Sequence, residues 1–467
     1  MGIISLSLND IESYFSTTRS VTVWIITVFS ISSAVGIISL GFLSKIFGRK
    51  LIYINAVIGF TIFSGLCGLS NNFETLLLCR GMQGFFGSGL VALSQALVID
   101  IFSKKSRSKA ISAWTFGLLA GPVIGPLLGG YIIEAFSWRW VFFINVPLGL
   151  LAFSGLIIFL NDSSYKSKTK INILGFVFLS ISAGTLQVFL DRGELEDWLD
   201  SNFIIVLLIL SISTLVLFIH NLFTSKNPLF PVEMFKDRFY IGSIFFAFLF
   251  GFILIPPFIL MPIFLSQVKD FPIYIVGLIL CISGLGGMFG TFFTSKIIYF
   301  LGNVRTMLLG LIIYIASNLE VTYWTESINI EQIILNMVYR GMSISIYYVA
   351  LADITYKTLP EKHRTYGAGL FQFFRTMGTG VAVAIFVALL NRYQLYFFEE
   401  FRNIFSPGNF YFFNELYLRD FSDQNFANFY TEINKQAKIK SFNKDFFLLS
   451  LSPILFFPFF FFYRKKN

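Results

Sequence analysis

Charged residues are scarce in this chain. Only 13% of its 467 residues are Asp, Glu, Lys or Arg, whereas a soluble domain carries about 25%. The three cysteines (Cys67, Cys79 and Cys281) lie in apolar stretches at no disulfide or metal spacing, so they define neither kind of site. The only two histidines, His220 and His363, lie at the ends of apolar segments, which argues against a histidine proton relay. The sequence contains no nucleophile elbow, phosphate loop or metal-ligand cluster, so an enzyme is not expected.

Apolar residues dominate instead. They make up 55% of the chain, and Phe alone occurs 60 times. A helix that crosses a bilayer needs roughly 20 mainly apolar residues, and thirteen segments meet that requirement: 20–43, 51–70, 75–99, 110–133, 140–160, 171–190, 203–223, 239–265, 273–298, 306–324, 332–356, 366–390 and 446–463. The sequence therefore predicts an all-α polytopic membrane protein.

The basic residues predict how the chain is threaded. Taken alternately, the short connections on one side hold 21 Lys and Arg, and those on the other hold only Arg19, Arg139, Arg192 and Lys269. The positive-inside rule places the richer side and the C-terminus in the cytoplasm. The net charge of +9 then reflects topology and predicts no nucleic-acid partner. The outer connection 391–445 is long, polar and aromatic, and it is either a small extracytoplasmic subdomain or a flexible loop.

A weak internal repeat divides the chain. Ser44-Lys-Ile recurs as Ser295-Lys-Ile, Arg80-Gly-Met recurs as Arg340-Gly-Met, and Arg107-Ser-Lys-Ala is echoed by Arg364-Thr-Tyr-Gly. The three landmarks keep their order at similar spacing, which is typical of transporters. The segments 171–190 and 203–223 have no counterpart and interrupt the two halves.

Arg80 is the most informative charge. It lies inside the segment 75–99, where a guanidinium costs several kcal/mol unless it faces protein or water. Gln83, Gly84 and Gly87 follow on the same helical face. We therefore predict that Arg80 and Gln83 control proton movement, and the alternative is a structural clamp on backbone carbonyls.

The segment 110–133 carries a regular stripe of glycine. Small residues every four positions allow a second helix to approach closely, and proline bends a helix by removing a hydrogen-bond donor. The segment is therefore predicted to form a closely packed, pliable gate, built from Gly117, Gly121, Pro122, Gly125, Pro126, Gly129 and Gly130.

A glycine-bounded basic turn follows the first apolar segment. Its charges could latch two helix ends in one state of the protein, and the alternative is a basic cluster that only sets topology. The residues of this predicted cytoplasmic latch are Gly41, Lys45, Gly48, Arg49 and Lys50.

Two further charges are candidates for proton coupling. Asp191 ends an apolar segment on the outer side, one turn after Gln187, and Arg375 lies mid-segment beside Gln372 and Thr379. A charge inside an apolar segment, such as Arg375, is expected to be functional, and Asp191 at a segment end is a weaker candidate.

These features resemble the motifs of the major facilitator superfamily. Residues 41–50 resemble its motif A, the Arg80 segment its motif B, and 117–130 the motif C of its antiporters. The stretches 138–149 (WRWVFFINVPLG) and 186–193 (LQVFLDRG) are similar to those of the 14-helix drug:proton antiporter branch, the EmrB/QacA-like multidrug exporters.

The resemblance implies a particular organisation. It implies an N-terminal bundle over 1–165, two inserted transmembrane helices over 166–225, and a C-terminal bundle over 226–467 that includes the connection 391–445. Two departures stand out: motif A has Lys45 where an acid is usual, and the acid-bearing first helix is incomplete, which leaves about 13 spans where the branch has 14.

The implied function is proton-coupled export of small hydrophobic or cationic drugs across the bacterial inner membrane by alternating access. No prosthetic cofactor or metal is expected. A periplasmic membrane-fusion protein and an outer-membrane channel are the implied partners. The alternatives are a transporter of the same fold for one physiological solute, such as a siderophore or fatty acid, and a non-transporting truncated remnant.

Overall fold

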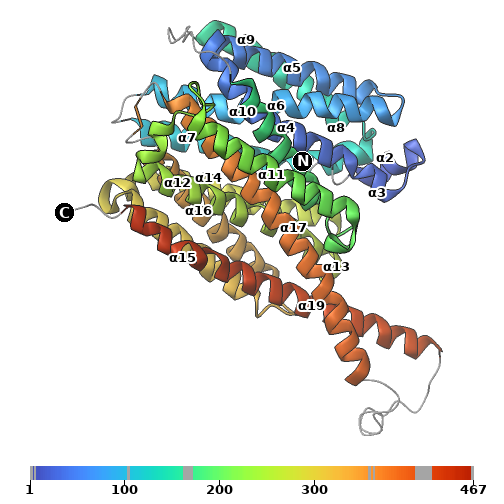
Figure 1. The fold of residues 1–467 in the computed structure, drawn as a ribbon. Helices are drawn as coiled ribbons and strands as arrows, with labels where there is room; N and C mark the ends of the chain where they lie inside the picture. Colours follow the sequence, from blue (N-terminus) through green and yellow to red (C-terminus); the bar gives the residue numbers. More distant parts are fainter. Residues whose placement is uncertain are drawn as a thin grey trace.

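The protein is a set of long, roughly parallel helices (Figure 1). The computed structural model describes residues 4, 7–102, 106–160, 172–355, 359–360, 363–404 and 423–463, and these residues form helices and connecting turns with no strand. The elements are α2 (Leu8–Phe15), α3 (Arg19–Thr22), α4 (Trp24–Phe47), α5 (Arg49–Leu69), α6 (Phe73–Ile101), α7 (Arg107–Ala135), α8 (Trp140–Phe143), α9 (Asn145–Phe159), α10 (Ile173–Arg192), η1 (Trp198–Asp200), α11 (Asn202–Thr224), η2 (Val232–Lys236), α12 (Arg238–Leu254), α13 (Pro256–Gln267), α14 (Ile273–Leu301), α15 (Asn303–Val321), α16 (Ile330–Thr355), α17 (Arg364–Ile404), α19 (Asp423–Leu451) and η4 (Ser452–Tyr463).

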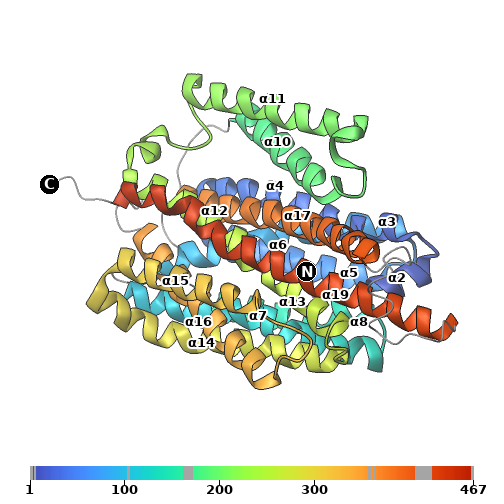
Figure 2. The same cartoon turned by 90° about the horizontal axis from the view of Figure 1, so that it is seen from below.

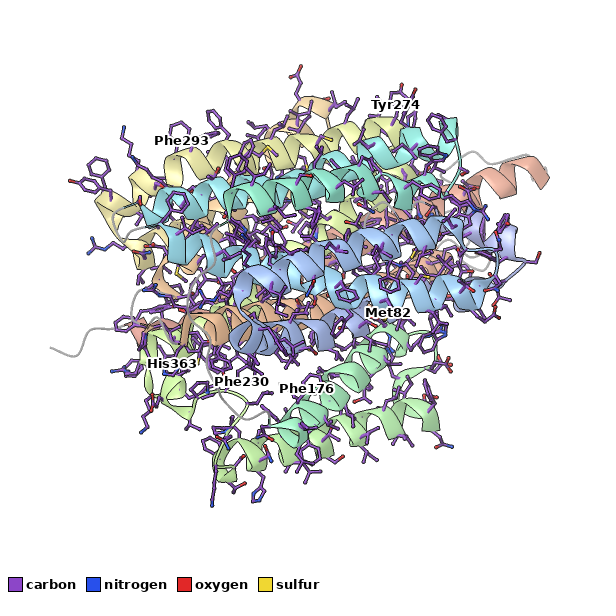
Figure 3. The ribbon with its side chains drawn as sticks, turned by 90° about the horizontal axis from the view of Figure 1, so that it is seen from above. Met82, Phe176, Phe230, Tyr274, Phe293 and His363 are labelled. Carbon is purple, nitrogen blue, oxygen red and sulfur yellow. The ribbon has the colours of Figure 1, made fainter. Side chains whose placement is uncertain are left out.

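The prediction of a polytopic helical membrane protein is confirmed. Within the described residues, 11 helical stretches are long and apolar enough to cross a membrane, and the remaining two predicted spans coincide with α4 and α7. Large apolar side chains cover the outside: Ile158 and Phe159 at the end of α9 are 70% and 83% exposed. Tyr274 and Phe293 lie on the outer face of α14 (Figure 3). Lipid is the solvent that such a surface requires.

Side-chain caps set several helix starts. Asn72, Asn172 and Asp237 accept hydrogen bonds from backbone N–H groups in the first turns of α6, α10 and α12. These groups have no partner within the helix, and short polar side chains at the N-cap satisfy them. The caps fix where these helices begin.

Each half of the chain contains the same glycine-mediated helix crossing. In the first half α4 crosses α6, where a Cβ on Gly36 would collide with the backbone oxygen of Phe85. In the second half α14 crosses α16, where Gly341 meets the backbone oxygen of Ser283 in the same way. Helices in lipid associate through such close packing. The crossing of α4 with α6 and that of α14 with α16 therefore show in the structure the same repeat that the sequence shows.

The two inserted helices lie to one side. Figure 2 shows α10 and α11 as a separate pair next to the row formed by α4, α17 and α12. Of the pair, α10 makes the contacts with the bundles, against α4 and α17. Because α4 belongs to the first half and α17 to the second, α10 touches both.

The described flanks of the connection 391–445 are helical, and the two alternatives for the whole connection, a subdomain or a flexible loop, stay predictions. Of its described residues, 391–404 continue α17 and 423–445 belong to α19, so both flanks are helical. The ends of α17 and α19 project beyond the other helices (Figure 1). The predicted last span, 446–463, is therefore the end of a longer helical stretch, which continues as the 3-10 helix η4. Because α19 is charged on one face and apolar on the other, the mean hydropathy of its consecutive residues is too low to predict a span.

One predicted span is broken in the middle. The segment 239–265 folds as α12 and α13, separated at Ile255 before Pro256 and Pro257. Proline lacks the N–H that would bond to the carbonyl four residues earlier. For Pro257 that carbonyl belongs to Ile253, and it accepts a hydrogen bond from the Tyr314 hydroxyl at 2.9 Å instead.

Candidate functional site

Arg80 is buried in the first bundle, with 2% of its surface exposed. It projects from α6, donates from Nε to the backbone oxygen of Ile25 in α4 at 3.3 Å, and donates from Nη1 to Gln83 Oε1 at 2.5 Å. Its guanidinium also lies 4.2 Å from the ring centroid of Phe29. A planar guanidinium can serve these partners together because it is both a fork of donors and a stacking surface.

Gln83 extends this network to a third helix. Its Nε2 donates to Ser64 Oγ in α5 at 2.5 Å, so one chain of hydrogen bonds joins α4, α6 and α5. Arg80 Nη2 remains buried without a partner. The sequence predicted that Arg80 and Gln83 share a face, and the structure places them in direct contact.

Arg340 occupies the matching position in the second bundle. It is also 2% exposed, and its Nε donates to Ser317 Oγ at 3.4 Å. Both Nη1 and Nη2 are buried without a partner. The sequence repeat contained this residue, but our predicted site omitted it.

Asp191 lies at the end of α10, against the first turns of α4. Its Oδ1 accepts a hydrogen bond from Gln187 Nε2 at 2.8 Å, and the neighbouring Arg192 lies 4.4 Å from the Trp24 ring centroid. Thr27 is the polar neighbour of the carboxylate, yet Thr27 Oγ1 and Asp191 Oδ2 both lack a well-formed hydrogen bond.

Arg80 and Asp191 therefore lie on either side of one turn of α4. Arg80 contacts Ile25 and Asp191 neighbours Thr27, and residues two apart on a helix point in different directions. The two side chains make no hydrogen bond or ion pair with each other in the described structure. The turn of α4 that both residues contact is the physical connection between Arg80 and Asp191.

The glycine–proline segment forms the continuous helix α7. A Cβ added to Gly117 or Gly121 would meet no atom within 4 Å, so the expected close approach of another helix is not present at these two positions. Gly125 is partly buried and Gly129 is buried. The side chains of Pro122 and Pro126, and the surroundings of Gly130, lie outside the described part.

The matching helix of the second half has a different environment. At Gly378 of α17, a Cβ would collide with the backbone oxygen of Phe248 in α12. Within the described residues, no helix stands against Gly117 and Gly121 as α12 stands against α17. Gly117 and Gly121 of α7 therefore lie on an open face, whereas Gly378 of α17 lies in a tight helix contact.

The predicted latch is a tight turn between α4 and α5. Gly48 joins these helices with a φ of 98°, and Gly302 joins α14 to α15 with a φ of 78°. This region of φ favours glycine over other residues. Arg49 begins α5 beside Lys50, whereas the surroundings of Gly41 and the side chain of Lys45 lie outside the described part.

A central aromatic cluster joins the two bundles, and our sequence analysis named none of its residues. Tyr348 of α16 is fully buried. Its ring lies 4.3 Å from that of Phe250 in α12 and stacks at 6.1 Å on Trp114 in α7. Gln95 Nε2 in α6 approaches the Tyr348 hydroxyl at 3.4 Å. The fourth predicted coupling residue, Arg375 of α17, lies within electrostatic reach of that hydroxyl.

One buried acid escaped the sequence analysis. Asp445 of α19 has no exposed surface, and neither carboxylate oxygen has a hydrogen-bond partner. An ionised carboxylate buried in this way is very costly. Its signal in the sequence is an acid on an apolar helical face, in a segment that the sequence pattern assigns to a connection.

Two bundles that repeat a buried arginine and meet at a shared aromatic cluster have the architecture of a membrane transporter. The chain belongs to the Major Facilitator Superfamily, whose family model matches residues 1–383. It is similar to the probable multidrug resistance protein EmrY of Escherichia coli (strain K12), with 29% identity over 401 residues, 84% of this chain and 77% of EmrY.

Two other curated relatives support the same branch. The multidrug export protein EmrB of Haemophilus influenzae is 27% identical over 92% of this chain and 85% of its own length. The fatty acid resistance protein FarB of Neisseria gonorrhoeae is 29% identical over 82% of this chain and 76% of its own. These relatives fit the EmrB/QacA-like branch.

The fold also matches a solved structure. The human organic anion transporter MFSD10 superposes with a TM-score of 0.59 at 14% identity, covering 95% of this chain and 88% of that one. At this identity the match concerns the fold alone.

Proposed function

We propose that this protein exports small amphipathic compounds across the bacterial cytoplasmic membrane in exchange for protons, by alternating access. The observation that carries the proposal is the buried network of Arg80, Gln83 and Ser64, set in a chain whose relatives are named as multidrug exporters. A charge at this depth is expected to serve transport because it is expensive to keep there. In this proposal the C-terminus faces the cytoplasm.

Proton binding is assigned to carboxylates. Arginine keeps its proton in proteins, so Arg80 and Arg375 can influence a carrier but cannot be one. Asp191 is the carrier that the sequence suggested, and one turn of α4 connects it to Arg80. Asp445 is a second candidate because it is buried without a donor.

Everted membrane vesicles test the coupling. Vesicles that contain the protein are energised to acidify their interior, and acridine orange reports the proton gradient. Adding ethidium should restore acridine orange fluorescence, because each exchange releases protons from the vesicles. Asp191→Asn and Asp445→Asn, which keep the side-chain size, identify the carrier by loss of this response. Ethidium transport that persists after a protonophore collapses the gradient would contradict proton coupling.

One alternative has a specific observation in its favour. The relative FarB is named for fatty acid resistance, which is consistent with a transporter of a single physiological solute. Such a protein would pass protons in response to a fatty acid and not to ethidium. A non-transporting remnant would respond to neither, although it would be present in the membrane.

The projecting ends of α17 and α19 are the proposed contact for a membrane-fusion protein. They extend beyond the other helices (Figure 1) and lie outside the membrane in the proposed orientation. A photo-crosslinking residue at the exposed Tyr396 should capture such a partner, whereas one at the exposed Phe292, on the side of α14, should not.

A further inference from the structure

Arg375 is a cation between the two bundles with no carboxylate beside it. Its Nε is buried without a hydrogen-bond partner, and its guanidinium forms no hydrogen bond or ion pair with any described residue. Tyr348 is the one titratable group described within its electrostatic reach. An unpaired cation at this depth is costly, so the site lacks a counter-charge.

The backbone holds Arg375 in place. At Gly251 of α12, a Cβ would collide with the backbone oxygen of Arg375. Thr379 Oγ1, one turn later, lies 3.3 Å from the Gly251 oxygen and 3.2 Å from the Arg375 oxygen. Because α12 and α17 touch backbone to backbone here, the base of the side chain cannot shift to find a distant partner.

The described acids of the membrane spans that are not exposed all lie elsewhere. Asp191 is bonded to Gln187, Glu320 to Asn336, and Asp353 to Asn303. The remaining one, Asp445, is on α19 and has no electrostatic partner. None of these four supplies the missing charge at Arg375.

Arg375 neighbours Tyr348, whose ring belongs to the aromatic cluster that joins the two bundles. Tyr348 packs with Phe250 and Phe371 of the second bundle and with Trp114 of the first. Gln372, one turn before Arg375, is 4% exposed and its Oε1 has no partner. A site with one cation, one free amide and several aromatic rings suits a molecule with an anionic head and an apolar body.

From this geometry we infer that the preferred substrates are amphipathic organic anions. Their carboxylate pairs with Arg375, which can bind it through two parallel hydrogen bonds, and their apolar body packs against the Tyr348 cluster. Cationic compounds meet the same positive charge and bind more weakly. The inference rests on the proposed transport function and narrows its substrate class.

A matched pair of probes separates charge from shape. Dansylaminoundecanoate and its methyl ester share a fluorophore and an alkyl chain and differ by one negative charge. We expect the purified protein in detergent to bind the acid about tenfold more tightly than the ester, the ratio that corresponds to roughly one good charge-assisted interaction. Fluorescence enhancement of the dansyl group measures both affinities.

Variants on one helix supply the controls. Arg375→Gln should bind acid and ester equally, and Arg375→Lys should keep part of the preference. Arg392→Gln removes a charge from an exposed position on the same helix, where it faces Glu194 at 3.7 Å, and should leave the preference intact. Equal affinities in the unaltered protein, or equal weakening of both probes by Arg375→Gln, would overturn the inference.

The measurement is independent of transport. Equilibrium binding in detergent needs no proton gradient, so a preference for the acid without any vesicle transport would refute the proposed export and leave the inference standing. Ethidium export together with equal binding of acid and ester would refute the inference alone.

Discussion

Arg80 and Arg340 occupy equivalent positions in the two bundles, yet they are held to different degrees. Both are 2% exposed. Arg80 donates to a backbone oxygen and to Gln83, whereas Arg340 has one long bond to Ser317 and two buried nitrogens without partners. The repeat keeps the buried arginine but neither its hydrogen-bond partners nor their number, so the two halves differ at this position.

Replacing Arg80 should separate export from folding. Arg80→Ala is expected to abolish ethidium export while the protein remains in the membrane, because the network that joins α4, α5 and α6 is lost. Arg80→Lys should restore little, since lysine lacks the planar fork that reaches Ile25 and Gln83 together. Export rates normalised to membrane protein measure both effects. If Arg80→Ala still exported ethidium against a gradient, Arg80 would have only a structural role, as a clamp on backbone carbonyls.

Two glycines should differ in what they tolerate. Gly341→Leu places a side chain against the backbone of Ser283 and should destabilise the protein, since overpacking typically costs about 1–3 kcal/mol. The Cβ of Gly121→Leu would meet no atom within 4 Å in this conformation, so we expect room for the side chain and a thermal midpoint that matches that of the unaltered protein. Thermal unfolding in detergent compares the two.

Gly121→Leu should nevertheless lose export. If α7 closes on this face in the opposite state, the added side chain opposes that state, and a few kcal/mol shifts such an equilibrium almost completely. Gly155→Leu on α9, which also meets no atom within 4 Å, is the matched control and should transport normally. Normal export by Gly121→Leu would show that this face stays open throughout the cycle.

The orientation has a direct test. In a background without the native cysteines, a membrane-impermeant maleimide added to intact cells should modify Asp200→Cys and spare Lys226→Cys. Both positions are exposed, and both should react after the membrane is permeabilised. The reverse pattern would invert the topology derived from the positive-inside rule.

The sequence predicted the helices and the charged network because both depend on local patterns. An arginine within an apolar segment can be recognised from the sequence as a candidate site residue, and the spacing of Gln83 places it on the same helical face as Arg80. The contact between Gln95 and Tyr348 joins residues 253 positions apart, and no local pattern encodes it. Asp445 was missed because the mean hydropathy of consecutive residues does not reveal the apolar face of α19, whose opposite face is charged.

Tyr314 should stabilise the protein through one hydrogen bond. Tyr314→Phe leaves the Ile253 oxygen without its donor and is expected to cost about 0.5–1.5 kcal/mol. Tyr347→Phe removes a similar bond, at 2.7 Å to the Phe246 oxygen. Because Phe246 lies within the unbroken part of α12, its oxygen keeps a helical partner, and the loss should be smaller. Equal thermal shifts for the two variants would contradict this explanation.

The break between α12 and α13 gives this span a joint that can bend cheaply. An intact helix must rupture its own hydrogen bonds to bend, whereas here proline has already removed one, and a rotatable hydroxyl on another helix has taken its place. Tyr314 also lies within electrostatic reach of Arg340. The Tyr314 hydroxyl therefore ties this joint to α15, the same helix whose Ser317 binds Arg340.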